Sequence, residues 1–111
     1  MMTLPANASL RDLQQYVHKT EEARGFADES VMEKCLLLGE EIGELFKAVR
    51  ERSGLGVDSS RRRRHVAEEL ADVLIVVVAI ANRYDICLED ALREKEKRNG
   101  RRSWSRISYE E

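Results

Sequence analysis

The feature that most constrains this chain is a pair of acidic residues placed within an apolar helix face. At about 100° per residue, the segment Leu37–Val49 gives one broad apolar arc that contains Glu41 and has Glu44 at its edge, with Glu40 further out. A carboxylate in a packed face is unfavourable unless a positive charge compensates it. This segment is therefore expected to be a helix that requires a cation beside it.

A second acidic pair repeats this design. Glu69 and Asp72 are also three residues apart, which places them on one side of a helix, and they precede an apolar run from Val73 to Ala81. The β-branched residues of this run would suit a buried strand, but the uninterrupted pattern from Arg64 to Arg83 is too long for an ordinary strand. We therefore predict a helix that is apolar and buried on every side. Because a small chain cannot easily bury such a helix alone, a subunit interface is expected.

The chain as a whole is predicted to be all-α. Its 111 residues form a single domain, with a core of about 9–102 and a tail of 103–111. Capping residues, apolar spacing and glycines predict four helices. They run from a Ser9 cap to about Gly25, from an Asp28 cap to about Arg52, from Ser59 or Ser60 to about Tyr84, and from Leu88 to about Asn99.

Composition narrows the location and partners. The net charge is −2, so we expect no nucleic-acid partner. No signal peptide is apparent, and the longest apolar run is far short of the roughly 20 residues that span a bilayer. We therefore expect no membrane partner. Cys35 and Cys87 lie in apolar-rich surroundings, which predicts buried, reduced thiols in a cytoplasmic protein. The basic run Arg61–Arg64 suits either phosphate binding or surface salt bridges.

The two acidic pairs together predict a metal site. If their helices pack antiparallel, four carboxylates meet in one small volume, and such oxygen ligands suit Mg²⁺, or Mn²⁺ in its place, rather than zinc. A di-iron site would need Glu-x-x-His motifs, which the chain lacks. The alternative is a solvated charged face, but the recurrence of the pair on a second, more apolar helix favours a site.

These residues resemble a known family. Glu40-Glu41-Ile42-Gly43-Glu44 followed by Glu69-Leu70-Ala71-Asp72 resembles the EExxE…ExxD signature of the all-α nucleoside triphosphate pyrophosphohydrolases. The sequence is closest in kind to MazG-like members, which are related to dCTP pyrophosphatases and dimeric dUTPases. The segment 95–102 resembles the Lys-x-x-x-Asn-x-x-Arg ending of that family. The resemblance covers about Leu10 to Arg102.

The resemblance implies a bundle of four or five helices, completed as a homodimer or homotetramer, that hydrolyses nucleoside triphosphates to a monophosphate and pyrophosphate. Such an enzyme would serve nucleotide-pool house-cleaning, with standard or modified nucleotides as substrates. It implies Mg²⁺ as the cofactor, and it implies that Glu40 orients or deprotonates the attacking water or holds an additional metal. Metal ligands would be Glu41, Glu44, Glu69 and Asp72, and phosphate or sugar contacts would come from Lys95, Asn99 and Arg102.

The base-binding part of the resemblance is weaker. Several relatives have an aromatic residue where this chain has Val76, so stacking on the base is not available there. Phe26 occupies a region where some relatives place a base-stacking ring, and it is our candidate for that role, with simple packing as the alternative. The base and sugar therefore cannot be read from the sequence. The alternative function is a non-catalytic helical oligomer that binds metal or nucleotide and acts through a partner.

Overall fold

The computed structural model describes residues 2–55 and 65–103, and these residues form four α-helices and no strand. The predicted all-α class is confirmed, and the apolar run Val73–Ala81 is helical. Arg61–Arg64 and most of the predicted tail lie outside the described residues. The helices are α1 (Leu10–Arg24), α2 (Val31–Arg52), α3 (Val66–Arg83) and α4 (Leu88–Gly100).

The ends of α1 follow directly from its sequence. The Asp12 backbone N–H donates to Ser9 Oγ at 3.0 Å, and the Ser9 N–H donates to Asp12 Oδ2 at 3.0 Å. This reciprocal pair satisfies donors that the first turn leaves free. Gly25 then ends the helix with a left-handed φ of 79°, a conformation that glycine adopts without steric penalty.

The start of α2 differs from the prediction. Ser30, and not Asp28, caps α2, because its Oγ accepts the backbone N–H three residues later at 3.1 Å. Helix α3 begins at Val66, with His65 at the N-cap position and no side-chain cap. Ser59 and Ser60, the predicted caps of this helix, lie outside the described residues.

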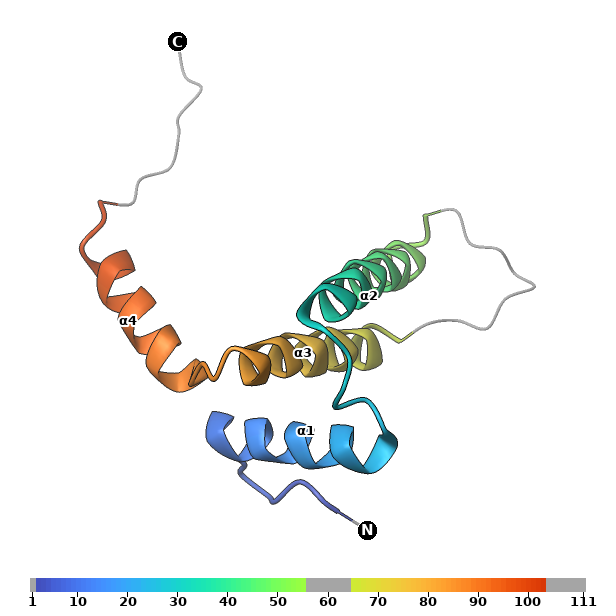
Figure 1. The fold of residues 1–111 in the computed structure, drawn as a ribbon. Helices are drawn as coiled ribbons and strands as arrows, with labels where there is room; N and C mark the ends of the chain where they lie inside the picture. The colour runs from blue at the N-terminus through green and yellow to red at the C-terminus, as the bar shows by residue number, and fades with distance from the viewer. Residues whose placement is uncertain (1, 56–64, 104–111) are drawn as a thin grey trace.

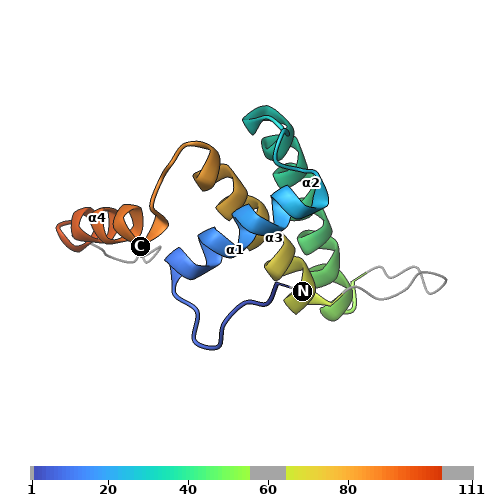
Figure 2. The same cartoon turned by 60° about the horizontal axis from the view of Figure 1, so that its bottom comes forward.

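Helix α3 is the centre of the arrangement. It lies between α2 and α1 and contacts both of them (Figures 1 and 2). Helix α4 follows a short connection after α3, is turned away from α2, and contacts α1 near the start of that helix (Figure 1). The acids of α2 and α3 can therefore meet within one chain, while α4 is held apart from them.

The core of the single chain is small and lies where α1 packs on α3. Val17, Val78 and Ala79 form its buried cluster, and Leu13 and Leu88 pack against it. Several large apolar side chains of α2 and α3 are left exposed instead. Leu74 and Ile75 are 47% and 43% exposed, so one chain does not bury α3 on every side.

The cysteines and the helix lengths give two further results. Cys35 is exposed and Cys87 is half-buried, so the prediction of two buried thiols is wrong. Apolar neighbours in the sequence did not reveal that Cys35 lies on the outer side of α2.

Across the described residues, no helix has both the length and the apolar character needed to cross a membrane.

Candidate metal and nucleotide site

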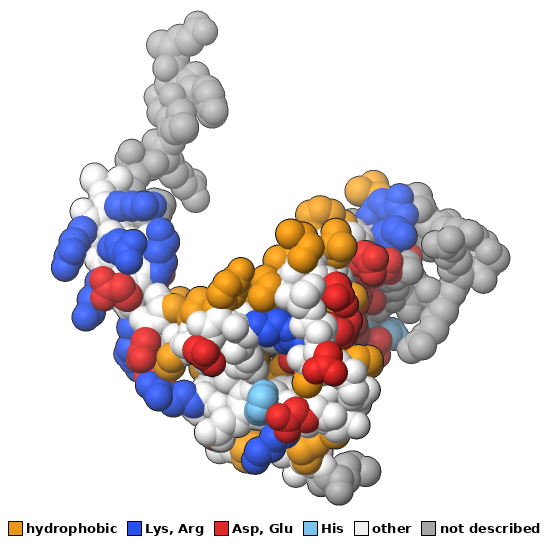
Figure 3. All heavy atoms as spheres, viewed as in Figure 1, with side chains coloured by type: hydrophobic (Ala, Val, Ile, Leu, Met, Phe, Trp, Pro, Cys, Tyr) orange, Lys and Arg blue, Asp and Glu red, His pale blue; other side chains and the backbone are white. Residues whose placement is uncertain are grey.

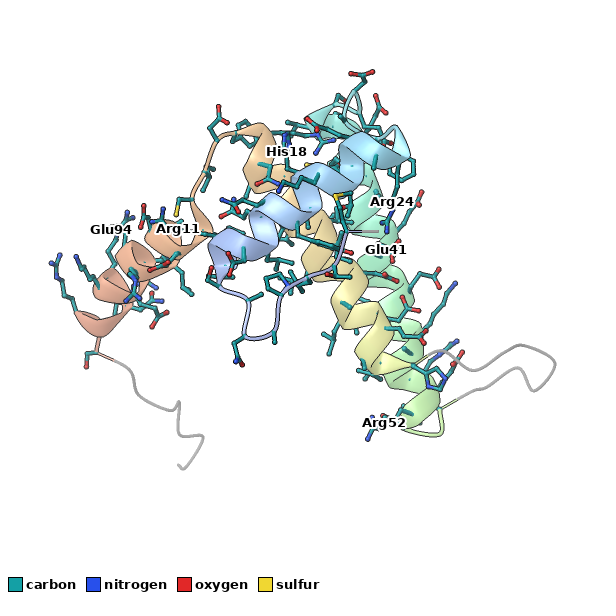
Figure 4. The ribbon with its side chains drawn as sticks, turned by 90° about the horizontal axis from the view of Figure 1, so that it is seen from below. Arg11, His18, Arg24, Glu41, Arg52 and Glu94 are labelled. Atoms are coloured by element: carbon teal, nitrogen blue, oxygen red, sulfur yellow. The ribbon has the colours of Figure 1, made fainter. Side chains whose placement is uncertain are left out.

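Three of the predicted acidic ligands meet where α2 and α3 pack together. Glu41 comes from α2, and Glu69 and Asp72 come from the first half of α3. Each offers one carboxylate oxygen, and these three oxygens lie within 4.8 Å of one another. Figure 4 shows Glu41 on α2 beside α3. We call Glu41, Glu69 and Asp72 the acid cluster.

The carboxylates of the acid cluster lie close enough to repel one another. Partial burial raises the pKa of Glu41, and the negative charges of Asp72, Glu69, Glu44 and Glu40 raise that pKa further. Burial and like charges both disfavour the ionised form. A cation between these oxygens would remove the repulsion, because the charged side chains that act on Glu41 within the described part of the chain are all acids.

The other two predicted acids lie beside the cluster. Glu44 is one turn further along α2, and its Oε1 lies 3.8 Å from Lys47 Nζ. It does not belong to the group of three oxygens, although its charge is felt by Glu41. Glu40 is exposed and contributes least of the four acids to the raised pKa of Glu41. The structure thus separates a tight group of three acids from two flanking ones.

The donor chemistry of the acid cluster fits a hard divalent cation. All three groups are carboxylates, and no histidine or cysteine takes part. Oxygen-only donors suit Mg²⁺ or Mn²⁺, whereas zinc sites usually include nitrogen or sulfur. Mg²⁺ commonly uses a few carboxylates and keeps positions for water and phosphate oxygens.

A cavity of about 280 Å³ lies beside the acid cluster, between α1, α2 and α3. Leu37, on its wall, is one helical turn before Glu41, and Val76 is one turn after Asp72. Phe26 also lines the cavity. It belongs to the connection between α1 and α2 and is 47% exposed. The cavity is thus mostly apolar and includes the Phe26 ring, and two of its lining residues lie one helical turn from acids of the cluster.

The predicted phosphate-binding residues are not near the acid cluster in the single chain. Lys95 and Asn99 lie on α4, and Arg102 follows it. About 16 Å of helix separates Asp72 from the end of α3 at 1.5 Å per residue, and α4 begins beyond that point. Figure 4 shows α4, with its labelled Glu94, on the far side of α1 from Glu41. Asn99 Nδ2 donates locally to Glu96 Oε1 at 2.9 Å.

Sequence reasoning missed three charged residues at the cavity. Glu21, Lys34 and Arg83 come from three different helices and form buried ion pairs there. Glu21 and Lys34 line the cavity wall directly. No local pattern identifies these residues, because the pairing depends on how α1 crosses α3. The one available signal was a lysine on an otherwise apolar side of α2.

Comparisons with known proteins agree with this geometry. The model of a family described as "MazG nucleotide pyrophosphohydrolase domain" matches residues 26–105. The crystal structure of a proposed pyrophosphatase, YPJD from Bacillus subtilis, superposes with a TM-score of 0.75 at 28% identity. The match covers 89% of this chain and 100% of that one. No curated protein sequence matches the chain.

Proposed function

Because the chain belongs to the MazG nucleotide pyrophosphohydrolase domain family, we propose that it hydrolyses nucleoside triphosphates between the α- and β-phosphates. Water adds to the α-phosphorus, the bond to the bridging oxygen breaks, and a nucleoside monophosphate and pyrophosphate leave. The observation that carries this proposal is the acid cluster, whose three oxygens lie within 4.8 Å. A cation held by these oxygens would relieve the repulsion between the carboxylates and would attract phosphate.

The acids are assigned roles by their positions. Glu41, Glu69 and Asp72 would hold Mg²⁺, with Mn²⁺ as a substitute, and Glu44 would complete the set from the next turn of α2. When bound, the cation would neutralise charge on the phosphate oxygens. Glu40 is exposed beside the cluster, where a carboxylate can orient the attacking water and accept its proton.

The cavity beside the acid cluster is proposed to take the base and sugar. Its apolar wall at Leu37 and Val76 begins one turn away from the acids, so a nucleotide with its phosphates at the acid cluster can place its base and sugar in this cavity. The Phe26 ring, on the same cavity, is in a position to contact a base. Stacking on an aromatic ring suits every base, which is why the ring alone does not identify the preferred nucleotide.

A second copy of the chain is proposed to complete the protein as a homodimer or homotetramer. Met32, Leu36 and Phe46 are 69%, 65% and 69% exposed and share one side of α2. Gly39 and Gly43 lie on the same side, and a Cβ added to either would meet nothing within 4 Å. Figure 3 shows apolar side chains along the upper edge of α2 and α3, whereas Lys and Arg gather on α4. An exposed apolar stripe of this kind is typical of a subunit interface.

This arrangement also offers a role for α4. Its predicted phosphate contacts, Lys95, Asn99 and Arg102, could reach the acid cluster of a neighbouring copy. Light scattering on the intact protein should report a dimer or tetramer, and a stable monomer of 12.8 kDa would contradict the proposal. Gly39→Leu should shift the assembly towards monomer without harming the single chain, because the added side chain has open space there.

The activity is tested with a panel of standard and modified ribo- and deoxyribonucleoside triphosphates in the presence of Mg²⁺. Monophosphate and pyrophosphate as products support the proposal, and diphosphate with phosphate would contradict it. Tight nucleotide binding without turnover of any substrate would favour the non-catalytic alternative. The same panel gives the base and sugar preference, which the cavity alone does not define.

A further inference from the structure

The connection between α1 and α2 is fixed by one side chain from α3. Arg83 Nη1 and Nη2 donate to the two carboxylate oxygens of Glu21 at 2.9 and 2.8 Å. The side chains of Arg83 and Glu21 are only 13% and 11% exposed. A two-pronged pair of this kind fixes orientation as well as distance. It therefore locks the end of α1 onto the end of α3.

The same guanidinium also binds the connection itself. Arg83 Nε donates to the Glu29 carbonyl at 2.7 Å, and Nη2 donates to the Phe26 carbonyl at 3.1 Å. Nη1 donates in addition to the Ala79 carbonyl of α3 at 2.9 Å. Arginine offers five donors in a rigid fork, which lysine does not. One side chain thus holds both ends of the segment 26–29.

Lys34 extends this network to the Phe26 ring. Its Nζ lies 2.9 Å from Glu29 Oε1 and 3.3 Å from Glu21 Oε2, and its side chain is 6% exposed. The same Nζ lies 5.4 Å from the centre of the Phe26 ring, within the range of a cation–π contact. Phe26 is therefore held by Arg83 at its backbone and by Lys34 at its ring.

The network lies along one wall of the cavity. Glu21, Phe26, Glu29 and Lys34 line that wall, and Ile75 and Val76 of α3 belong to the rest of the lining. Buried ion pairs are commonly no more stabilising than apolar residues of similar size, so their value to the protein need not be stability. Here the ion pairs and hydrogen bonds tie α1, α2, α3 and the segment 26–29 together along this wall.

We propose that Arg83 is a positioning residue that sets base selectivity, because its hydrogen bonds hold the segment 26–29 and the Phe26 ring at the cavity. The inference rests on the proposed function, and it predicts a specific division of labour. The acid cluster determines the rate of hydrolysis, and the network of Glu21, Lys34 and Arg83 determines which bases are accepted.

The test is the variant Arg83→Lys, which keeps the positive charge and removes the fork. We expect KM for the preferred nucleotide to rise about tenfold, a change in the range of altered pocket contacts, with kcat within about threefold of the parent. The ratio of kcat/KM between the best and worst nucleotides should fall by a similar factor. A merely structural defect would lower the rates for all nucleotides alike. The matched control is Arg93→Lys, an exposed arginine paired with Glu89 on α4.

A second variant guards against a folding defect. Glu21→Gln combined with Arg83→Gln removes both opposite charges together, so that neither is left buried and unpaired. It should show the same loss of selectivity. If the parent is active but both variants keep its selectivity, the positioning role is wrong and the proposed function stands. If the parent hydrolyses no nucleotide, the proposed function fails and the inference fails with it.

Discussion

Glu21 lies on the wall of the cavity, and the acid cluster lies one helical turn beyond that cavity. These two sets of acids differ in what surrounds them. Glu21 has two cations within ion-pair distance, Arg83 at 2.8 Å and Lys34 at 3.3 Å. Among the described residues, the charged groups that act on Glu41 are further acids, and oxygens of Glu69 and Asp72 lie within 4.8 Å of its own. The same residue type thus occupies a compensated environment in one place and an uncompensated one in the other.

The two pKa shifts have opposite directions for this reason. Burial acts to raise the pKa of Glu21, but hydrogen bonds and charge from Arg83 and Lys34 outweigh burial and lower it. Burial raises the pKa of Glu41, and its acidic neighbours raise it further. A buried acid with internal partners serves the architecture, whereas one without partners indicates a place for an external cation. The comparison therefore distinguishes an acid held by ion pairs from an acid surrounded by other acids.

We expect the largest effect when one acid is removed from the acid cluster. Asp72→Ala should lower metal-dependent turnover by about 10³-fold, since a bound cation supplies several kcal/mol of charge stabilisation and each 1.36 kcal/mol is tenfold. Metal affinity, measured by calorimetric titration of Mn²⁺, should fall with it. The control is Glu94→Ala, an exposed acid of α4. Normal metal binding by Asp72→Ala would show that the acid cluster is not the metal site.

A smaller loss of turnover is expected when Glu40, which lies beside the acid cluster, is changed. Glu40→Gln preserves size and removes basicity, so turnover should fall by about 10²-fold, the lower end of typical general-base contributions. Mn²⁺ affinity should remain close to that of the parent, because Glu40 lies outside the group of three oxygens. Parental turnover in this variant, measured at saturating metal and nucleotide, would remove Glu40 from the mechanism.

The sequence predicted one of the two acid groups and not the other, for a physical reason. The acid cluster could be found because the spacing of apolar residues identifies the apolar side of each helix, and two amphipathic helices pack by those sides. Glu21 and Arg83 are 62 residues apart, and each looks like an ordinary surface charge on its own helix. Their pairing follows from the crossing of α1 over α3, which helical periodicity does not determine.

The start of α2 shows the same limit on a smaller scale. Asp28 was the predicted cap of α2, but Ser30 is an equally good capping residue, and the segment 26–29 decides between them. That segment is bound at Phe26 and Glu29 by Arg83, and α2 can begin only after it. A long-range contact thus decides a local boundary.

A bound metal ion should stabilise the acid cluster and leave the ion pairs of Glu21 unaffected. Ligand at about 100 times its dissociation constant adds roughly 2.7 kcal/mol, which corresponds to about 10–20 °C in melting temperature for a domain of this size and less for an oligomer. Saturating Mg²⁺ or Mn²⁺ should raise the melting point of the parent and of Arg83→Lys, and a chelator should reverse the shift. Asp72→Ala should lose the shift. A parent whose melting curve ignores both metal and chelator would argue against the acid cluster as a cation site.

The smallest expected effect is the pH dependence of the compensated group. The folded-state pKa of Glu21 is lowered, so its stabilisation is present above the unfolded-state pKa of about 4.3 and is lost as the pH falls through the folded value. Glu21→Gln should therefore be less stable than the parent at pH 7, by roughly 2 kcal/mol for hydrogen bonds to a charged group. The difference should shrink as the pH falls below the unfolded-state pKa and through the lowered folded-state pKa of Glu21, where the parent carboxyl becomes protonated in the folded protein as well. Denaturant unfolding at a series of pH values, in the presence of chelator, measures it, with Glu94→Gln as the exposed control. A difference that stays constant from pH 7 to about pH 3 would mean that the Glu21 charge does not stabilise the fold, and the contrast with Glu41 would then rest on geometry alone.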